Sequence, residues 1–206
     1  MLKTKIIILD FDYTLFDAKK FKNYLAKSLQ IFGVNKKLWQ ETYDQIRYRS
    51  NKEADYSPKK HLKILAAKTN NQLSDLKTAY DKIINNCAKF LYADSLDFLQ
   101  KLQAKNLRLI LLTFGNPSFQ RQKIRASGIN KYFKKIFCTN KDKFKVSNQI
   151  PNADNALFIN DNPDEITKLQ KIHPKADFIQ IKRPNAKKFA VKLKDLKIYT
   201  DLKIKM

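Results

Sequence analysis

The stretch KIIILDFDYTLFD, residues 5–17, decides the fold of this chain. It begins with a run of four branched apolar residues, residues 6–9, without the polar alternation of a half-exposed strand. An uninterrupted run of this kind is typical of a parallel strand that is buried on both faces. We therefore expect a central strand of an open α/β sheet at this position.

Two carboxylates and a hydroxyl follow the apolar run directly, at Asp10, Asp12 and Thr14. Ligands of open α/β sheets collect just beyond the carboxyl ends of the strands, so this is the position of a site. The two acids repel each other and lose hydration, which costs stability unless a cation lies between them. A divalent metal is the simplest remedy. The alternative is an ordinary Asp-rich turn, but Phe11 and Phe16 make this turn more apolar than a solvated one.

Residues 18–91 show no convincing strand pattern and indicate an inserted helical bundle. Gly33 suits the end of a first helix, and Ser57 followed by Pro58 suits the start of a third. Residues 47–60 are polar and rich in turn formers, and we expect them to be mobile or to face the substrate. The four expected helices cover residues 21–32, 38–48, 58–66 and 73–91.

From residue 93 onward, helices alternate with short apolar strands, which is typical of a doubly wound parallel sheet. The strand LRLILLT ends on Thr113, and Gly115 follows it, where a glycine lets backbone amides approach a bound group. Leu96 is expected to face inward from its helix. The further strands are expected at residues 107–113, 135–139, 156–160 and 177–182, and the helices at 96–106, 118–128, 143–150 and 163–172. The last segment is expected to be a helix or a short strand.

The polar groups that follow the strands should converge, because parallel strands place their carboxyl ends at one edge of the sheet. Carboxylates, a hydroxyl, a close-approach glycine and a lysine together describe a magnesium-assisted phosphoryl-transfer site, in which an aspartate can act as nucleophile. Beyond the first strand, these groups are Thr113, Lys141, Lys143, Lys145, Asn160, Asp161, Asp164 and Glu165.

These residues resemble the motifs of the haloacid dehalogenase (HAD) superfamily. DFDYT, residues 10–14, resembles its DxDxT motif, and LLTFGN, a downstream lysine and FINDNPDE resemble the other three motifs in their usual order. The resemblance extends over the whole chain. It implies an α/β core formed by residues 1–17 and 92–206, with a Rossmann-like parallel sheet, and an all-α helical cap formed by residues 18–91.

The resemblance also implies a role for each site residue. Asp10 would attack the phosphorus and form an aspartyl-phosphate. Asp12 would protonate the leaving oxygen and then activate the water that hydrolyses the intermediate. The phosphate oxygens would be held by Thr14, Thr113, the amides of Phe114 and Gly115, and Lys143.

Magnesium is the cofactor that the resemblance implies, and hard oxygen ligands with retained waters suit this ion in any family. The ligands would be the Asp10 carboxylate, the Asp12 main-chain carbonyl and the Asp161 carboxylate, with Asp164 or Glu165 acting through water.

Two positions near the expected metal leave alternatives open, and a third departs from the family pattern. Glu165 stands where the acid of a capping box would reach back to Asn162, so it serves either the metal or only its helix. We prefer Lys143 over Lys141 as the site lysine because Lys143 opens the helix before the fourth motif, and the alternative is a merely solvated lysine. Asn160 departs from the Gly or Asp that the family usually has before its acid.

The net charge of +23 in 206 residues is the strongest feature of the composition and the least specific. Six of the 42 basic residues are Arg, whereas base reading and bidentate phosphate contacts favour Arg over Lys. We interpret the charge as a solvated surface and do not favour nucleic-acid binding. No stretch has the length of a membrane span. Cys87 and Cys138 suit buried thiols in the cytoplasm, and the isolated His61 and His173 suit the surface or helix ends.

The sequence therefore predicts a magnesium-dependent phosphatase for a small phosphomonoester such as a nucleotide or sugar phosphate. Dehalogenases of the superfamily lack an acid at the position of Asp12, so this residue favours phosphate esters. A phosphomutase or phosphotransferase would also keep it, and an inactive module that binds nucleic acid is the alternative from another class. Specificity is expected in the cap, where the aromatic residues either stack on a base or, more commonly, fill the bundle. These residues are Trp39, Tyr43, Tyr48 and Tyr56. The sequence carries no signal for oligomeric state.

Overall fold

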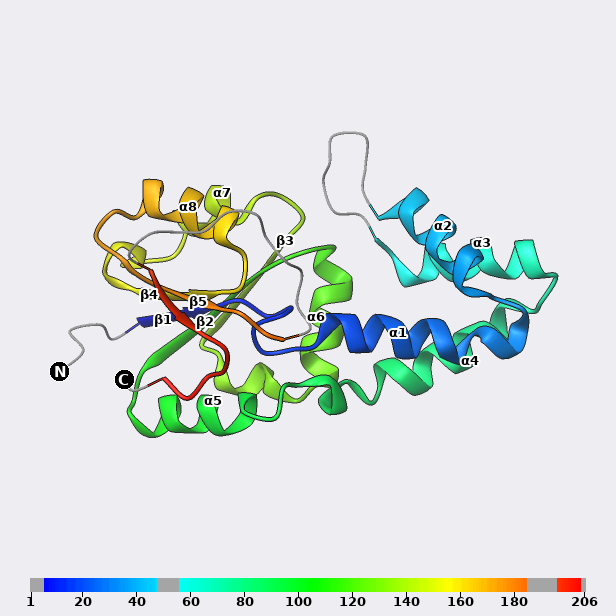
Figure 1. Cartoon of the computed structure of the whole chain (residues 1–206), viewed down its shortest axis with the longest axis horizontal. Helices are drawn as coiled ribbons and strands as arrows, with labels where there is room; N and C mark the ends of the chain where they lie inside the picture. Colours follow the sequence, from blue (N-terminus) through cyan, green and yellow to red (C-terminus); the bar gives the residue numbers. More distant parts are fainter. Residues whose placement is uncertain (1–5, 48–55, 185–195, 205–206) are drawn as a thin grey trace.

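A parallel sheet of six strands, in the order β3-β2-β1-β4-β5-β6, forms one end of the molecule (Figure 1). The computed structural model describes residues 6–47, 56–184 and 196–204. The strands are β1 (Ile6–Leu9), β2 (Arg108–Phe114), β3 (Lys135–Thr139), β4 (Leu157–Asn160), β5 (Asp177–Ile181) and β6 (Lys197–Tyr199). The first strand lies between β2 and β4, as its uninterrupted apolar run predicts. The last segment forms a short strand, which was one of its two expected structures.

Helices cover both faces of the sheet, which confirms the doubly wound fold (Figure 1). Ile7 and Leu9 of β1 pack in the core on the α5 and α6 side, whereas Ile6 and Ile8 pack in the core on the α7 and α8 side. Both faces of β1 are therefore apolar because both are buried. The helices are α5 (Ser95–Ala104), α6 (Pro117–Ala126), α7 (Lys143–Ser147) and α8 (Pro163–Ile172), with short 3₁₀ helices η3 (Ile129–Tyr132) and η4 (Ala153–Asn155).

The chain between β1 and α5 is helical and projects away from the sheet (Figure 1). Its helices are α1 (Ala18–Ser28), η1 (Gln30–Phe32), α2 (Lys36–Ile46), α3 (Pro58–Thr69), α4 (Leu73–Ile84) and η2 (Cys87–Phe90). Asn35 and Ser57 cap the starts of α2 and α3, and Gly33 adopts the left-handed conformation that ends η1. The expected helix over residues 73–91 is wrong at its end, because α4 stops at Ile84. Residues 48–55, within the expected substrate-facing stretch, lie outside the described residues.

The two chain segments that join this helical part to the sheet pair with each other. The backbone N–H of Asp17 donates to the carbonyl of Phe90 at 2.8 Å, and that of Tyr92 donates to the carbonyl of Leu15 at 3.0 Å. The insertion therefore leaves and rejoins the core at a single place. In the described parts of the chain, no helix is long and apolar enough to cross a membrane.

The buried Arg183, just after β5, fastens this junction to the core. It donates to the carbonyl of Thr14 from Nε at 3.2 Å and from Nη2 at 2.8 Å. Its other hydrogen bonds go to both carboxylate oxygens of Asp94, at 2.7 and 2.8 Å. Asp94 also accepts from the backbone of Leu202 at 2.9 Å. One side chain thus holds segments on both sides of the insertion, with the bidentate geometry for which arginine is suited.

Two expectations about exposure are wrong. Leu96 is 42% exposed instead of facing inward, and His61, within α3, is buried, with an exposed fraction of 1%. His173 lies at the end of a helix, which was one of its two expected places, and is 3% exposed. Its ring contacts Asp154 and Ser147. Isolated histidines carry no periodic signal that separates a buried ring from an exposed one, so only the tertiary structure decides their place.

The tautomer of His61 follows from its two partners. The Thr42 hydroxyl donates to the Leu38 carbonyl at 2.7 Å, so it can only accept from the Nε2–H of His61 at 2.8 Å. Nδ1 of His61 then accepts from the Tyr56 hydroxyl at 3.2 Å. The neutral ring satisfies this network, and burial, helped by the charge of Lys22, lowers the pKa of His61 to about 4.

We expect His61→Gln to flatten the loss of stability in acid. An unfolded chain protonates this ring near its ordinary pKa of 6.5, and the folded protein protonates it at about 4. The unfolded state binds the extra proton between these values, so stability is fully present above pH 6.5 and falls as the pH decreases toward 4. The substitution should remove roughly 2–3 kcal/mol of this decrease, measured by urea denaturation at neutral pH and at about pH 4.5. Parallel pH dependences of the two proteins would contradict the assignment.

Candidate active site

A buried lysine lies at the centre of the carboxyl edge of the sheet. The Nζ atom of Lys143, at the start of α7, is 2.6 Å from Oδ1 of Asp10 and 2.7 Å from Oε2 of Glu165. Lys143 is 4% exposed, while Lys141 and Lys145 are exposed. The preference for Lys143 over Lys141 therefore agrees with the geometry, since Lys143 is the lysine that contacts Asp10.

The carboxyl groups of Asp161 and Asp10 line the same pocket and interact with each other. The two residues follow β4 and β1, which are neighbours in the sheet. Both are buried, and burial raises the pKa of Asp10 to about 6, opposed by the charge of Lys143. Burial and the charge of Asp10 raise the pKa of Asp161. The site therefore holds two buried acids whose repulsion the lysine offsets only in part.

The donor set fits a magnesium ion. Four carboxyl groups, those of Asp10, Asp12, Asp161 and Glu165, face two ammonium groups. When all four are ionised, the excess negative charge of the site matches the charge of one divalent cation. No three side chains of His, Cys, Asp and Glu form a metal cage among the described residues. Magnesium does not require one, because it keeps several waters and takes one or two carboxylates. Asp10 and Asp161, with the Asp12 carbonyl that the family resemblance implies, would hold it.

Asp164 and Glu165, the two acids that could act on the metal through water, differ in position. Asp164 is exposed, whereas Glu165 accepts from Lys143 and from Nδ2 of Asn160 at 2.9 Å. The capping-box alternative fails for Glu165, because the backbone N–H of Asn162 donates to Oδ1 of Asn160 at 3.1 Å. Asn162 still caps α8 by accepting from the backbone of the next turn. Glu165 thus belongs to the group formed by Lys143, Asp10, Asp161 and Glu165, which we call the lysine cluster. Asn160 stabilises the loop that precedes Glu165.

Thr14 is not placed to bind phosphate. Its side chain is fully buried, and its Oγ1 has no hydrogen-bond partner in the described structure. Its carbonyl accepts from Arg183. The expectation that Thr14 holds a phosphate oxygen is therefore wrong, and its part in the structure is to anchor the loop after β1.

Gly115 was expected to let its amide approach a bound group, but the reason for a glycine here is the nearby side chain of Gln120. The N–H of Gly115 donates to the carbonyl of Thr139 at 2.8 Å, so this amide is not available for a phosphate oxygen. A Cβ at Gly115 would lie 3.0 Å from Cδ of Gln120, and its φ of +146° is one that residues with side chains rarely adopt. The glycine makes room for Gln120. Thr113 and Phe114 line the same pocket as Asp10 and Lys143, in agreement with their expected place.

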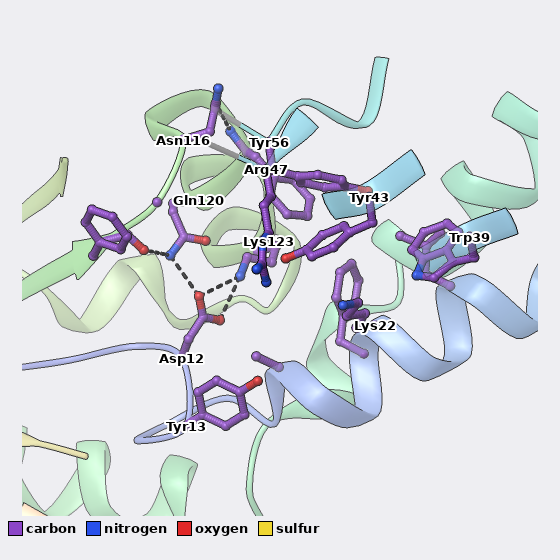
Figure 2. Close-up of a pocket in the computed structure, with 16 residues that line it drawn as sticks. Asp12, Tyr13, Lys22, Trp39, Tyr43, Arg47, Tyr56, Asn116, Gln120 and Lys123 are labelled. Carbon is purple, nitrogen blue, oxygen red and sulfur yellow. Dashed lines mark hydrogen bonds and ion pairs between the residues drawn. The ribbon is translucent and has the colours of Figure 1, made fainter. Parts of the chain in front are cut away.

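Two residues of α6 that no sequence motif indicated hold the carboxylate of Asp12. Lys123 and Gln120 both contact it, and both are buried (Figure 2). Lysine and glutamine on a helix usually indicate a solvated face. Their helical spacing does indicate that both face inward, because the buried side of α6 includes Gln120, Lys123 and Ile124.

A second cavity of about 230 Å³ adjoins this centre and shares Asp12, Tyr13 and Phe114 with it (Figure 2). Helices α1 and α2 and Tyr56, two residues before α3, provide one wall, and α6 provides the other. Three aromatic rings pack in a row along the cavity. The ring centroids of Tyr43 and Tyr56 are 4.9 Å apart, and those of Tyr56 and Phe119 are 5.2 Å apart.

Trp39 fills the bundle, one of the two uses expected for the aromatic residues of the helical part, since it is 4% exposed and packs in the core. It also lines the cavity, together with Tyr43 and Tyr56. Stacking on a base, the other expected use, stays a prediction. Lys22 lies at the same cavity, with its Nζ 3.6 Å from the ring centroid of Tyr43. Tyr48 lies outside the described residues.

A family model for haloacid dehalogenase-like hydrolases matches residues 4–173. The chain belongs to this family. The match spans the lysine cluster, the helical insertion and both residues of α6, so the HAD-like resemblance of the sequence motifs is confirmed. No curated protein matches the chain.

Solved structures of other HAD hydrolases share the fold. YfnB from Bacillus subtilis, described as bound to magnesium, has a TM-score of 0.64 at 16% identity, over 97% of this chain and 95% of its own. The L-2-haloacid dehalogenase from Xanthobacter autotrophicus has a TM-score of 0.57 at 16% identity, over 87% and 78%. A protein from Clostridium difficile whose structure is described as that of a phosphatase has a TM-score of 0.51 at 21% identity, over 86% and 85%. The fold is thus found both in a dehalogenase and in a protein described as a phosphatase.

We expect Gly115→Ala to destabilise this HAD hydrolase by about 3 kcal/mol, because the new Cβ combines backbone strain with overpacking against Gln120. Gly33→Ala is the matched control, since Gly33 also has a positive φ, of +76°, but its Cβ would meet nothing within 4 Å. The control should lose only about 1–2 kcal/mol. The free energy of unfolding in urea measures both. A Gly115→Ala/Gln120→Ala double variant should recover part of the loss, and no recovery would show that the clash is not the cause.

Proposed function

We propose that this HAD hydrolase is a magnesium-dependent phosphatase that cleaves small phosphomonoesters, of the nucleotide or sugar phosphate class, through an aspartyl-phosphate on Asp10. The observation that carries the proposal is the Asp12 carboxylate, which faces both the buried lysine cluster and the adjoining cavity. A second acid in this place suits proton transfer to and from a leaving group and a water. It has no evident use in a carbon–halogen displacement by Asp10.

Each of the clustered residues has a task in this reaction. Asp10 supplies the carboxylate oxygen that attacks phosphorus, and Lys143 keeps that carboxylate ionised and attracts the phosphate. Thr113 can donate its hydroxyl proton to a phosphate oxygen, because its present contact with Gln120 uses the hydroxyl only as an acceptor. When bound, magnesium would neutralise charge on the transferred phosphoryl group.

The helical part, residues 18–91, would serve as the cap of a core formed by residues 1–17 and 92–206. The leaving group of the substrate would occupy the cavity between α1, α2 and α6, since Asp12 must reach the leaving oxygen from that cavity. Both cysteines are free thiols, which suits the reducing cytoplasm.

The first test is hydrolysis of p-nitrophenyl phosphate and of a panel of nucleotide and sugar phosphates, with magnesium and with excess EDTA. We expect turnover that requires magnesium, and a loss of roughly 1,000-fold or more in kcat for Asp10→Asn, because the nucleophile is removed. Urea denaturation of the variant controls for folding.

Other results would support other functions. Magnesium-independent release of halide from 2-chloropropionate would indicate a dehalogenase. Transfer of phosphate to an added sugar without release to water would indicate a mutase or phosphotransferase. A folded protein that is inactive on the whole panel, but binds a particular nucleic acid at physiological salt, would indicate a binding module.

Lys22 provides a test of the leaving-group cavity. Burial lowers the pKa of its ammonium, which lies on the ring of Tyr43 and is 3.4 Å from the side-chain oxygen of Gln40. An anionic group on the substrate would stabilise this charge. We expect Lys22→Met to lower kcat/KM about tenfold for an aryl phosphate with a ring carboxylate, and to change it little for phenyl phosphate.

The matched control is Lys20→Met, on the exposed side of the same helix. It removes the same charge from the protein without touching the cavity, so both substrates should keep their rates. An equal effect of the two substitutions on the carboxylated substrate would show that only the net charge of the protein matters.

A further inference from the structure

The carboxylate of Asp12 is held from the side of α6. Nζ of Lys123 lies 2.7 Å from Oδ1 and 2.9 Å from Oδ2, and Nε2 of Gln120 lies 2.9 Å from Oδ2 (Figure 2). Both oxygens are therefore occupied, and three contacts fix the plane of the carboxylate. Charge-assisted hydrogen bonds of this length are among the stronger ones in proteins.

The ammonium of Lys123 is placed at a cost to the fold. The side chain of Lys123 is 5% exposed and that of Asp12 is 23% exposed. The rings of Phe11, Phe16 and Phe119 also lie around Nζ, with centroids at 5.2–5.3 Å. A buried ion pair seldom stabilises a fold more than apolar residues of the same size would. A lysine in this position is better explained by what it does to Asp12.

Gln120 connects Asp12 to the second strand. Its Nε2 is 2.7 Å from the hydroxyl of Thr113 and 2.9 Å from the carbonyl of Phe114, besides its contact with Asp12. A carboxylate and a carbonyl only accept, so the amide nitrogen must face them. The lack of a side chain at Gly115 leaves room for this contact. The orientation of Asp12 is thus set by the same side chain that touches Thr113.

We propose that Lys123 and Gln120 are positioning residues for Asp12, which hold its carboxylate so that it can activate water in the second half of the reaction. This inference rests on the proposed phosphatase function. In that step, the carboxylate of Asp12 takes a proton from water while the water oxygen attacks phosphorus. The bond between phosphorus and the Asp10 oxygen breaks, Asp10 keeps the electron pair, and inorganic phosphate leaves. The proton taken from water restores the acid form of Asp12 for the next leaving oxygen, and it is released to solvent only where the leaving group departs as an anion.

Loss of the contacts from α6 should therefore affect the two half-reactions differently. The leaving group of p-nitrophenyl phosphate departs as an anion, so the first half-reaction with this substrate needs no proton from Asp12. The second half-reaction always needs a base that is aligned with the water. Loss of the α6 contacts should therefore slow hydrolysis of the aspartyl-phosphate while its formation continues.

The experiment is rapid-mixing kinetics of Lys123→Met and Gln120→Leu with p-nitrophenyl phosphate and magnesium. We expect a burst of nitrophenolate of about one equivalent per enzyme, followed by a steady state that is at least roughly tenfold slower than in the wild type. Intact-mass measurement after an acid quench should show the phosphorylated chain accumulating in both variants. A variant that is merely less stable would lose burst and steady state together.

Matched variants complete the test. Gln122→Leu lies on the same helix and removes a contact with the Tyr80 hydroxyl at 2.9 Å, so it should produce no burst and no phosphorylated chain. Lys123→Arg keeps the charge and should restore part of the steady-state rate. Gln120→Leu removes no buried charge, so it keeps the test decisive if Lys123→Met does not fold.

Two failures are distinguishable. A wild-type protein without turnover, or turnover that survives Asp10→Asn, overturns the proposed function and this inference with it. Wild-type turnover that Asp10→Asn abolishes, combined with folded Lys123→Met and Gln120→Leu proteins that show no burst, overturns the inference alone.

Discussion

The ion pair between Lys143 and Asp10 is the interaction on which the site depends. A buried ammonium is costly by itself, at several kcal/mol, and here it is shared between a carboxylate after β1 and that of Glu165 on α8. One cation therefore ties three segments together. The parallel strands bring Asp161 to the same edge, where the lysine cannot offset every acid. The remaining negative charge is the electrostatic reason to expect a divalent cation.

The fold was predictable where periodicity and terminal signals decide it. The expected strand over residues 135–139 and helix over 163–172 agree with β3 and α8 residue by residue. Where tertiary contacts decide, prediction failed. The amphipathic pattern of α5 includes Leu96, yet this residue lies beyond the edge of the covered face. No local pattern distinguishes a buried His61 from an exposed one.

The site was predictable to the extent that it follows strand ends. Asp10, Asp161 and Lys143 come together because topology places them at one edge. Gln120 and Lys123 could not be found in this way, since they lie within a helix, and in a chain with 42 basic residues one inward lysine does not stand out. The need for glycine at position 115 was foreseen, but its cause was not, because the crowding comes from a side chain five residues later.

Helix α6 connects the acid/base residue with the helical part of the molecule. Within two turns, Phe119 packs on Tyr56 at a centroid distance of 5.2 Å, Gln122 accepts from Tyr80, and Lys123 pairs with Asp12. A helix of this length moves as one body, so a shift of the helical part that carries Tyr56 and Tyr80 also acts on the groups that orient Asp12. A leaving group bound in the cavity would contact Tyr56 on one side and Asp12 on the other. Selection of the leaving group and alignment of the Asp12 carboxylate are therefore coupled through one rigid element, α6. A substrate too small to fill the cavity would not contact Tyr56, so its binding would not act on the alignment of Asp12.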